Sequence, residues 1–250
     1  MIKVSNVCKY FNGVKVLDNI STNFLPGKCN LTIGKSGSGK TVLLRTIAGL
    51  YQPEEGFISY DERVFANMTR EQKISLRKDI GFIFQEGALF DSMNVEENIM
   101  FPLRMFTNMR RKERLERVNY CLERVNLKNV NKMFPSQLSG GMRKRVAIAR
   151  AISAQPKYLF CDEPNSGLDP VTSIVIDKLI MDITHEYNMT TIVNTHDMNS
   201  VMEIGENIIF INKGKLWWQG DNNNVLTTDN LELNDFIFCS ALTKKIKEKI

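Results

Sequence analysis

The segment GKSGSGKT, from Gly34 to Thr41, carries the clearest chemical signal in this sequence. It matches the phosphate-loop pattern G-x-x-x-x-G-K-[ST] at every fixed position. Its glycines let successive backbone N–H groups face phosphate oxygens, and a helix that starts here adds its positive end. Lys40 is expected to reach the β- and γ-phosphates, and the Thr41 hydroxyl to ligate Mg²⁺. The predicted nucleotide contacts in this segment are Gly34, Lys35, Ser36, Gly37, Ser38, Gly39, Lys40, Thr41 and Val42.

Two adjacent carboxylates, Asp162 and Glu163, form a second chemical group. They follow the apolar run YLFC, which predicts a buried strand whose carboxyl end opens on a cleft, where parallel α/β sheets bind ligands. Asp162 is expected to hold Mg²⁺ through its water ligands, and Glu163 to orient and deprotonate the water that attacks the γ-phosphate. The competing interpretation is that both acids only cap the turn PNSGLDP, residues 164–170.

These side chains need a sheet that brings them to one edge. Cys29, Leu31 and Ile33 alternate with polar residues before the phosphate loop, which predicts a strand, and Leu43 begins an apolar helical pattern after it. Another apolar run, TTIVNT, predicts a buried strand that ends just before His196. A lone histidine is usually a surface residue or a satisfied core residue. The common edge of parallel strands favours a γ-phosphate contact for this one.

Composition places the chain among globular proteins with an ordinary core. It has 250 residues, of which 43% are hydrophobic and 24% charged, and its net charge of +5 is most simply a solvated basic surface. No run approaches the ~18 apolar residues of a membrane helix, and the start MIKVSNVCKY lacks the apolar stretch of a signal peptide. Five scattered cysteines are typical of buried thiols in a reducing compartment, and two histidines do not favour a zinc site.

Taken in order, these motifs resemble those of the ATP-binding subunits of ABC transporters, and the resemblance covers nearly the whole chain. Gln85, in IGFIFQEG, matches the glutamine of the family's Q-loop, which senses Mg²⁺ and water. Asp169, within SGLDP, matches the D-loop aspartate, and His196 matches the H-loop histidine. Phe11 occupies the place of the aromatic residue that stacks on adenine, with Tyr10 as the other candidate.

The segment LSGGM matches the family signature L-S-G-G through Ser139, Gly140 and Gly141. At the start of a helix these residues leave open N–H groups for a phosphate. The resemblance implies that this phosphate belongs to ATP bound by the phosphate loop of a second copy, so that two subunits meet head to tail around two nucleotides. Met142 stands where glutamine is common, and Asn165 where threonine is frequent. We expect the backbone contacts to survive the first of these changes.

The basic residues that follow the signature have a simpler explanation than phosphate binding. Arg143, Lys144, Arg145 and Arg150 lie on a predicted helix whose apolar residues need burial, so we expect most of them to form a solvated face. At most one or two are expected to approach phosphate.

The stretch between the Q-loop and the signature contains no catalytic motif. Leu115, Val118, Leu122 and Val125 recur at spacings of three and four, which predicts a helix with one apolar face. The resemblance implies that residues 87–137 form a helical subdomain. Its groove would receive a short cytoplasmic helix of the membrane subunit.

The expected fold is an α/β P-loop NTPase of the ABC ATPase type. It comprises a mostly parallel core sheet with flanking helices, an N-terminal antiparallel β subdomain and an inserted helical subdomain. Residues 1–86 and 138–225 would form the nucleotide-binding core with its antiparallel part, and residues 226–250 a C-terminal tail. A hairpin turning at Lys213-Gly214 is predicted near the end of the core.

The sequence thus predicts an ATPase subunit that uses Mg²⁺, dimerises around two ATP molecules and powers a permease at the cytoplasmic face of the inner (cell) membrane. EGALFDSMNVEENIMFPL, residues 86–103, together with LSGGMRKR, resembles the MlaF-type ATPases of Mla/Mce lipid transporters. This resemblance predicts lipid cargo and an Mce-domain protein as a possible further partner. The alternative within the family is an importer of an amino acid or another small solute.

Two alternative hypotheses, which place the protein in other functional classes, are less favoured. A soluble ABC ATPase acting on DNA or ribosomes would carry long coiled coils or two cassettes. Only about a hundred residues without sustained heptads separate the phosphate loop from the signature here, so no nucleic-acid partner is expected. A P-loop kinase of a small metabolite would explain Lys40 and Asp162, but it would leave Ser139, Gly140 and Gly141 without a role.

Overall fold

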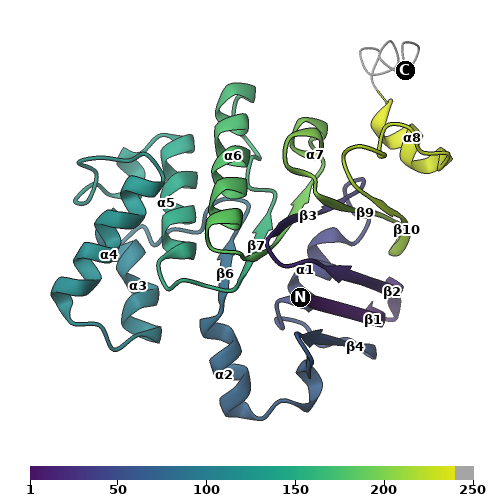
Figure 1. Cartoon of the computed structure of the whole chain (residues 1–250), viewed down its shortest axis with the longest axis horizontal. Coiled ribbons are helices and arrows are strands. Elements are labelled where there is room, and N and C mark those ends of the chain that lie inside the picture. Colours follow the sequence, from purple (N-terminus) through teal and green to yellow (C-terminus); the bar gives the residue numbers. More distant parts are fainter. Residues whose placement is uncertain (240–250) are drawn as a thin grey trace.

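A mostly parallel sheet forms the centre of the computed structural model of the chain, which describes residues 1–239 (Figure 1). Its strands, in the spatial order β10-β9-β3-β8-β7-β6, are β3 (Lys28–Ile33), β6 (Ile80–Ile83), β7 (Tyr158–Asp162), β8 (Thr190–Thr195), β9 (Asn207–Asn212) and β10 (Lys215–Gly220). All neighbouring strands pair in parallel except β9 and β10, which are antiparallel. The predicted strands before the phosphate loop, the acid pair and His196 are therefore confirmed.

A second, antiparallel sheet is built from the N-terminal part of the chain, as predicted. Its strands, in the order β2-β1-β4-β5, are β1 (Ile2–Phe11), β2 (Val14–Phe24), β4 (Glu55–Tyr60) and β5 (Arg63–Val64). Tyr60 on β4 packs edge-on against Tyr158 on β7, with ring centroids 5.1 Å apart. This contact belongs to a core that joins the two sheets and lies against one face of the central sheet.

Helices cover both faces of the central sheet and form a separate cluster beside it (Figure 1). They are α1 (Lys40–Ile47), α2 (Arg70–Lys78), α3 (Val95–Phe106), α4 (Arg111–Arg124), α5 (Gly140–Ile152), α6 (Pro170–Glu186), α7 (Met198–Ile204) and α8 (Leu231–Ile237), with short 3₁₀ turns η1 (Phe65–Asn67) and η2 (Pro135–Gln137). Strand β7 shows how the faces are divided. Tyr158 and Phe160 pack in the core that contains α1, whereas Leu159 and Cys161 pack in the core that contains α5 and α6.

Helices α3 and α4 form the predicted helical subdomain, and both pack against α5. Helix α3 begins at a capping box, in which the side chain of Asn94 accepts from the Glu97 N–H at 2.9 Å and the Glu97 carboxylate accepts from the Asn94 N–H at 3.0 Å. On α4 and at its end, Val118 and Val125 are buried as expected. Leu115 is 37% exposed, so the apolar face of α4 is narrower than the spacing predicted.

The predicted hairpin near the end of the core is confirmed. Lys213 and Gly214 both have positive φ, 49° and 75°, which suits the tight two-residue turn between β9 and β10. A Cβ on Gly214 would lie 2.3 Å from the Val16 carbonyl oxygen, so this position also needs glycine for a close approach.

Part of the predicted tail is a packed helix. Leu233 and Ile237 on α8 are buried, and Phe236 contacts Phe210 with ring centroids 5.6 Å apart. The remainder of the predicted tail, residues 240–250, lies outside the described residues. Four of the five cysteines are buried as expected, but Cys239 is exposed because it follows the end of α8. Across the part of the chain that the structure describes, no helix combines the length and apolar character needed to cross a membrane.

Candidate functional site

The phosphate loop connects β3 to α1, in the strand–loop–helix order that the sequence predicts. Gly34 has a φ of 150°, and a Cβ there would lie 2.2 Å from the Ile211 carbonyl oxygen, so no larger residue fits. Gly39 has a φ of 108° and is the residue from which α1 starts. The Lys40 ammonium donates to the carbonyl oxygens of Gly34 and Lys35 at 2.8 and 3.1 Å. The backbone of the loop therefore curls around the Lys40 ammonium, which is hydrogen-bonded to its carbonyl groups.

Two buried groups in this loop suit a phosphate ligand. Burial lowers the pKa of Lys40, while the carboxylates of Glu163 and Asp162 act in the opposite direction. The buried Ser38 hydroxyl has no hydrogen-bond partner among residues 1–239. A phosphate oxygen would provide an acceptor for that hydroxyl and a counter-charge for the lysine, so the loop fits the triphosphate of ATP.

Two of the three residues predicted to hold Mg²⁺, Thr41 and Asp162, meet at the carboxyl edge of the sheet. Asp162 ends β7, and its Oδ1 accepts from the Thr41 hydroxyl and from the Asn194 amide, each at 3.0 Å. Hard oxygen donors of this kind suit Mg²⁺, which usually keeps several waters and binds phosphate oxygens as well. The donor set therefore fits a nucleotide-bound Mg²⁺.

Glu163 and His196 lie together at this edge, as the parallel arrangement predicts. The Glu163 carboxylate is 3.2 Å from Nδ1 of His196. Glu163 has a φ of 47°, an uncommon conformation for a non-glycine residue, and its N–H donates to the Asn194 carbonyl at 3.0 Å. Backbone strain of this kind is concentrated at functional sites.

Gln85 reaches the same region from the end of β6. Its side-chain amide donates to the Ser166 hydroxyl at 3.3 Å, and the Ser166 N–H donates to the Glu163 carbonyl at 3.1 Å. The predicted Q-loop glutamine is thus two hydrogen bonds away from the predicted general base. Sequence reasoning did not identify Ser166 as the residue between them.

Phe11 offers a more accessible aromatic face than Tyr10. The Phe11 ring is 38% exposed and meets Tyr51 edge-on, with centroids 5.3 Å apart. Tyr10 is half-buried and donates to Glu55 at 3.2 Å. The structure is therefore compatible with the preferred candidate for adenine stacking.

The signature residues begin α5, on the side of the central sheet that faces away from α1. Ser139 is the N-cap residue, and its hydroxyl accepts from the Met142 N–H at 3.2 Å. The apolar side chains of α5 belong to one core and those of α1 to the other, so the two helices pack on opposite faces of the sheet. In Figure 1, β6 and β7 lie between them. Asp169, the predicted D-loop aspartate, is exposed at the start of α6.

The expectation for the basic residues after the signature is wrong at two positions. Lys144 and Arg150 are only 6% and 8% exposed. Arg143 is exposed, as expected, and Arg145 is half-buried. For Arg150 the reason is that residues 146–150 are buried without a break, so α5 has little solvated face there, whereas Lys144 lies before this run and donates to the Gln85 carbonyl oxygen. The uninterrupted run VAIARAI was the sequence signal for this burial.

A buried carboxylate joins the D-loop segment to the helix that follows His196. Asn165 donates to the Ser200 hydroxyl at 3.3 Å, and that hydroxyl donates to Asp177 at 2.7 Å. Burial raises the pKa of Asp177 to about 6; the Ser200 hydrogen bond lowers it, and the charges of Asp197 and Glu203 raise it further. Asn165, which departs from the common threonine, is thus part of a network between α6 and α7.

Asp177→Asn should stabilise the protein at about pH 7.5 by roughly 1–3 kcal/mol and raise Tm by roughly 3–10 °C. The pKa of Asp177 lies above its ordinary value, so the folded chain retains this proton to higher pH than the unfolded chain. The stability gained from the neutral acid is complete below about pH 4 and is lost as the pH rises through about 6. Asparagine keeps a neutral acceptor for Ser200. Thermal melts should show the gain vanish near about pH 4, and an equal difference at about pH 4 and about pH 7.5 would contradict this explanation.

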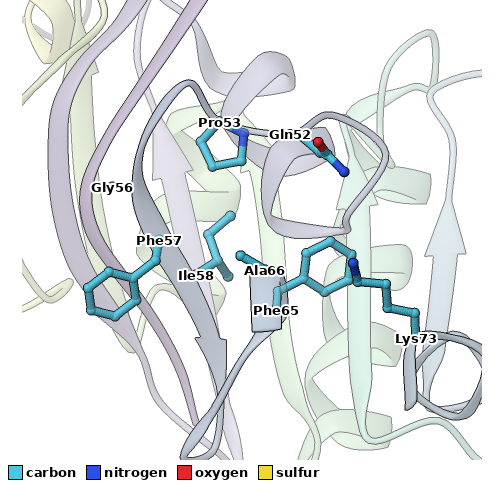
Figure 2. Close-up of a pocket in the computed structure, with 8 residues that line it drawn as sticks. All are labelled: Gln52, Pro53, Gly56, Phe57, Ile58, Phe65, Ala66 and Lys73. Carbon is cyan, nitrogen blue, oxygen red and sulfur yellow. The ribbon is translucent and has the colours of Figure 1, made fainter. Parts of the chain in front are cut away.

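A cavity beside β4 contains none of the predicted site residues (Figure 2). It is lined mainly by apolar groups of β4 and η1, among them Ile58 and Phe65. The Lys73 ammonium lies 5.2 Å from the centroid of the Phe65 ring, and Figure 2 shows the two side chains next to each other. Lys73 is the one cation that lines this cavity, and its ammonium already contacts an aromatic ring. The cavity is therefore not assigned to the nucleotide site.

The fold and the edge of the sheet that carries the phosphate loop, the acid pair and His196 define a P-loop ATPase of the ABC type, as predicted. The chain belongs to the ABC transporter family, whose model matches residues 17–166. It is an ATPase subunit of an ABC transporter, associated with that membrane transporter as a peripheral subunit.

Two relatives illustrate the similarity at the sequence level. The chain is 34% identical over 236 residues to the probable ribonucleotide transport ATP-binding protein mkl of Mycobacterium leprae, covering 94% of this chain and 68% of that protein. It is 38% identical over 237 residues to the methionine import ATP-binding protein MetN of Clostridium tetani, covering 95% of this chain and 74% of that protein.

Solved structures confirm the fold. The chain is similar to the dimeric ATP-binding cassette MJ0796 in a post-hydrolysis state bound to ADP and Pi, with a TM-score of 0.81, 33% identity, and coverage of 89% of this chain and 99% of that one. It is also similar to cbiO1 of Clostridium perfringens, part of the ABC transporter complex cbiONQ, with a TM-score of 0.84, 27% identity, and coverage of 100% and 98%.

Proposed function

We propose that two copies of this chain pair head to tail, enclose two ATP molecules and hydrolyse them to drive a permease. The observation that carries this proposal is the placement of the phosphate loop and the signature on helices that pack on opposite faces of one sheet. We infer that Ser139 completes the pocket of a second copy and not the pocket of its own Lys40. The similarity to a cassette solved as a dimer with ADP and Pi supports this arrangement.

Within each pocket, different residues would bind different parts of the ATP molecule. Phe11 would stack on the adenine, and the N–H groups of residues 34–42 would hold the phosphates with Lys40. Ser139, Gly140 and Gly141 of the partner copy would contact the γ-phosphate from the other side, with Asp169 at the seam between the two copies. Bound Mg²⁺ would neutralise charge on the phosphates. Thr41, Asp162 and Gln85 are the residues that would hold it.

The hydrolytic step would depend on Glu163 and His196. Glu163 would accept a proton from the attacking water, and the γ-phosphate would be held in place by His196 as the nucleophile approaches. The 3.2 Å contact between the two side chains keeps both at the same edge of the sheet. Gln85, tied to Glu163 through Ser166, would orient the water.

An apolar groove on the helical subdomain is the proposed contact with the permease. It runs between β6, the Q-loop and α3, and includes Phe84, which is 37% exposed, and Phe90, which is 41% exposed. Such a groove suits the apolar side of a short helix. The chain would act as one ABC ATPase domain, with residues 87–137 as its docking subdomain, residues 226–250 as its tail and the rest as its nucleotide-binding core. It would be held by the permease at the cytoplasmic face of the cell membrane.

For the cargo we propose a lipid, moved by a permease that works with an Mce-domain protein. The support is the sequence of residues 86–103, which combines the Q-loop flank with the start of α3. A second candidate is import of a small solute. It is supported by the similarity to proteins named for ribonucleotide transport and methionine import.

Purification from native membranes separates these candidates. Tagged full-length protein should retain a permease after gentle solubilisation, and that complex should carry phospholipid and an Mce-domain protein. A complex with a solute-binding protein, together with ATP-dependent uptake of methionine or a nucleotide into vesicles, would replace the lipid assignment with the small-solute one. Recovery of ribosomal proteins and no permease would overturn the transport function.

A further inference from the structure

The two buried cations of α5 bind the backbone of the Q-loop. The Lys144 ammonium donates to the carbonyl oxygen of Gln85. The Arg150 guanidinium donates to the carbonyl oxygens of Gly87 and Ala88, both at 2.7 Å. Ala88 has a positive φ of 46°, so this backbone path is one that an alanine rarely adopts unaided. Helix α5 therefore determines the shape of the Q-loop.

Burying a cation costs free energy unless its hydrogen bonds are satisfied. The Q-loop carbonyl groups satisfy those of Lys144 and Arg150. Burial lowers the pKa of Lys144, and the carboxylates of Glu86 and Glu163 oppose that effect. The ammonium group is thus close to the catalytic edge as well as to the Q-loop.

The same helix begins at the signature. Ser139 is its N-cap residue, and five residues at 1.5 Å per residue put Lys144 only about 7 Å further along the helix axis. On the other side of Lys144, Gln85 contacts Ser166, and Ser166 contacts Glu163. A path of about 1.4 helix turns and three hydrogen bonds thus runs from the signature to the backbone carbonyl of Glu163, the predicted general base.

The two ends of this path serve different nucleotides in the proposed dimer. Ser139 would contact the ATP held by the partner copy, whereas Gln85 and Glu163 would act on the ATP held by their own chain. A small shift of α5 on closure around one nucleotide would move the Gln85 carbonyl, because the Lys144 contact joins them directly.

We propose that Lys144 is a positioning residue that couples the two ATP sites, so that engagement of the signature with one nucleotide sets Gln85 for hydrolysis of the other. This inference rests on the proposed head-to-tail dimer. Arg150 would support it by holding Gly87 and Ala88, while Lys144 makes the link to Gln85 itself. The coupling predicts that hydrolysis depends on ATP concentration with a Hill coefficient above 1 and at most 2, the number of sites.

The test compares Lys144→Met, Lys144→Gln and Lys144→Arg with the wild-type full-length chain. In Lys144→Met, the Hill coefficient should fall to about 1 and kcat should fall roughly 5- to 20-fold, because the donor to the Gln85 carbonyl is lost. Binding of a fluorescent ATP analogue to the monomer should change less than about twofold, since the phosphate loop is untouched. Lys144→Arg, which keeps a cationic donor, should restore cooperativity, and Lys144→Gln should show it reduced.

Arg145→Met is the matched control, because Arg145 lies on the same helix and donates to the Asn126 carbonyl at 3.3 Å, away from the Q-loop. It should keep the wild-type Hill coefficient. If Lys144→Met does not fold, as judged by its thermal melt, Lys144→Gln and Lys144→Arg decide the outcome.

Wild-type cooperativity in Lys144→Met, or its loss in Lys144→Arg, would overturn the coupling role. A wild-type chain that dimerises and hydrolyses ATP without cooperativity would also overturn it. Failure of the wild-type chain to dimerise or hydrolyse ATP would instead refute the proposed function, so the two failures are distinguishable.

Discussion

Glu163→Gln should lower the rate of ATP hydrolysis by roughly 10²–10⁴-fold, the usual contribution of a general base. The amide has nearly the same shape as the carboxylate but cannot accept a proton from water. Binding of ATP should stay intact, because the phosphate loop and Lys40 come from a different part of the chain. The measurement is steady-state phosphate release at saturating ATP, paired with equilibrium binding of a fluorescent ATP analogue.

The matched control for this variant is Glu116→Gln. Glu116 lies on the exposed side of α4, so the same chemical change there should leave hydrolysis within about twofold of wild type. Wild-type hydrolysis in Glu163→Gln would remove Glu163 from the role of general base. It would favour the simpler interpretation in which Asp162 and Glu163 only terminate β7.

Ser139→Arg should abolish ATP-dependent pairing and reduce hydrolysis at least about 100-fold, because a long cation would occupy the space where the partner's γ-phosphate must lie. Loss of the helix cap adds about 1 kcal/mol of local destabilisation. The monomer should still bind ATP, since α1 and α5 pack on opposite faces of the sheet. Light scattering with ATP in the Glu163→Gln background measures pairing, which this background should preserve by slowing hydrolysis.

Ser139→Ala controls for the lost cap, since it removes the hydroxyl but adds no bulk. It should retain ATP-dependent pairing with reduced affinity. Ser139→Arg chains that still pair with ATP would show that the signature does not face a partner's nucleotide.

Local sequence patterns were sufficient to predict that the phosphate loop, the acid pair and His196 meet at one edge of the central sheet. Each strand that leads to it is a short apolar run followed directly by functional residues, and parallel pairing then brings the ends of β7 and β8 together. The pairing of Asp162 with Asn194 and the contact between Glu163 and His196 follow from that register. The glycine pattern of the phosphate loop is likewise local, because it reflects the backbone conformation of a few adjacent residues.

Burial of polar residues could not be predicted in this way. Asn30 and Thr32, the polar residues that alternate with Cys29, Leu31 and Ile33 before the phosphate loop, are both buried. The Asn30 amide donates to the Leu25 and Thr191 carbonyls, at 3.0 and 2.9 Å, and so satisfies its polar atoms inside the protein. Thr191 is 161 residues away in sequence, and no local pattern identifies such a partner.

The same limit applies to the control of the Q-loop. Lys144 and Gln85 are 59 residues apart, and Arg150 and Gly87 are 63 apart. Charge alone suggested a solvated face, because a cation is ordinarily exposed unless a partner compensates for its burial. Only the tertiary structure supplies the carbonyl groups that make burial of these two side chains possible.

A mixing experiment with two inactive variants tests most directly whether each pocket is built from two chains. Lys40→Ala removes ATP binding at the phosphate loop of the chain that carries it. Ser139→Arg blocks the signature with which the chain would contact the ATP of its partner. In a mixed pair both defects fall in one pocket, and the other pocket is wholly wild type. The mixture should regain hydrolysis that neither variant shows alone, but each mixed pair should stay below about half of the wild-type rate, because it has one intact pocket of two and that pocket lacks the coupling proposed for Lys144. If mixed pairs form but hydrolyse no more ATP than the separate variants, the pocket does not span two chains.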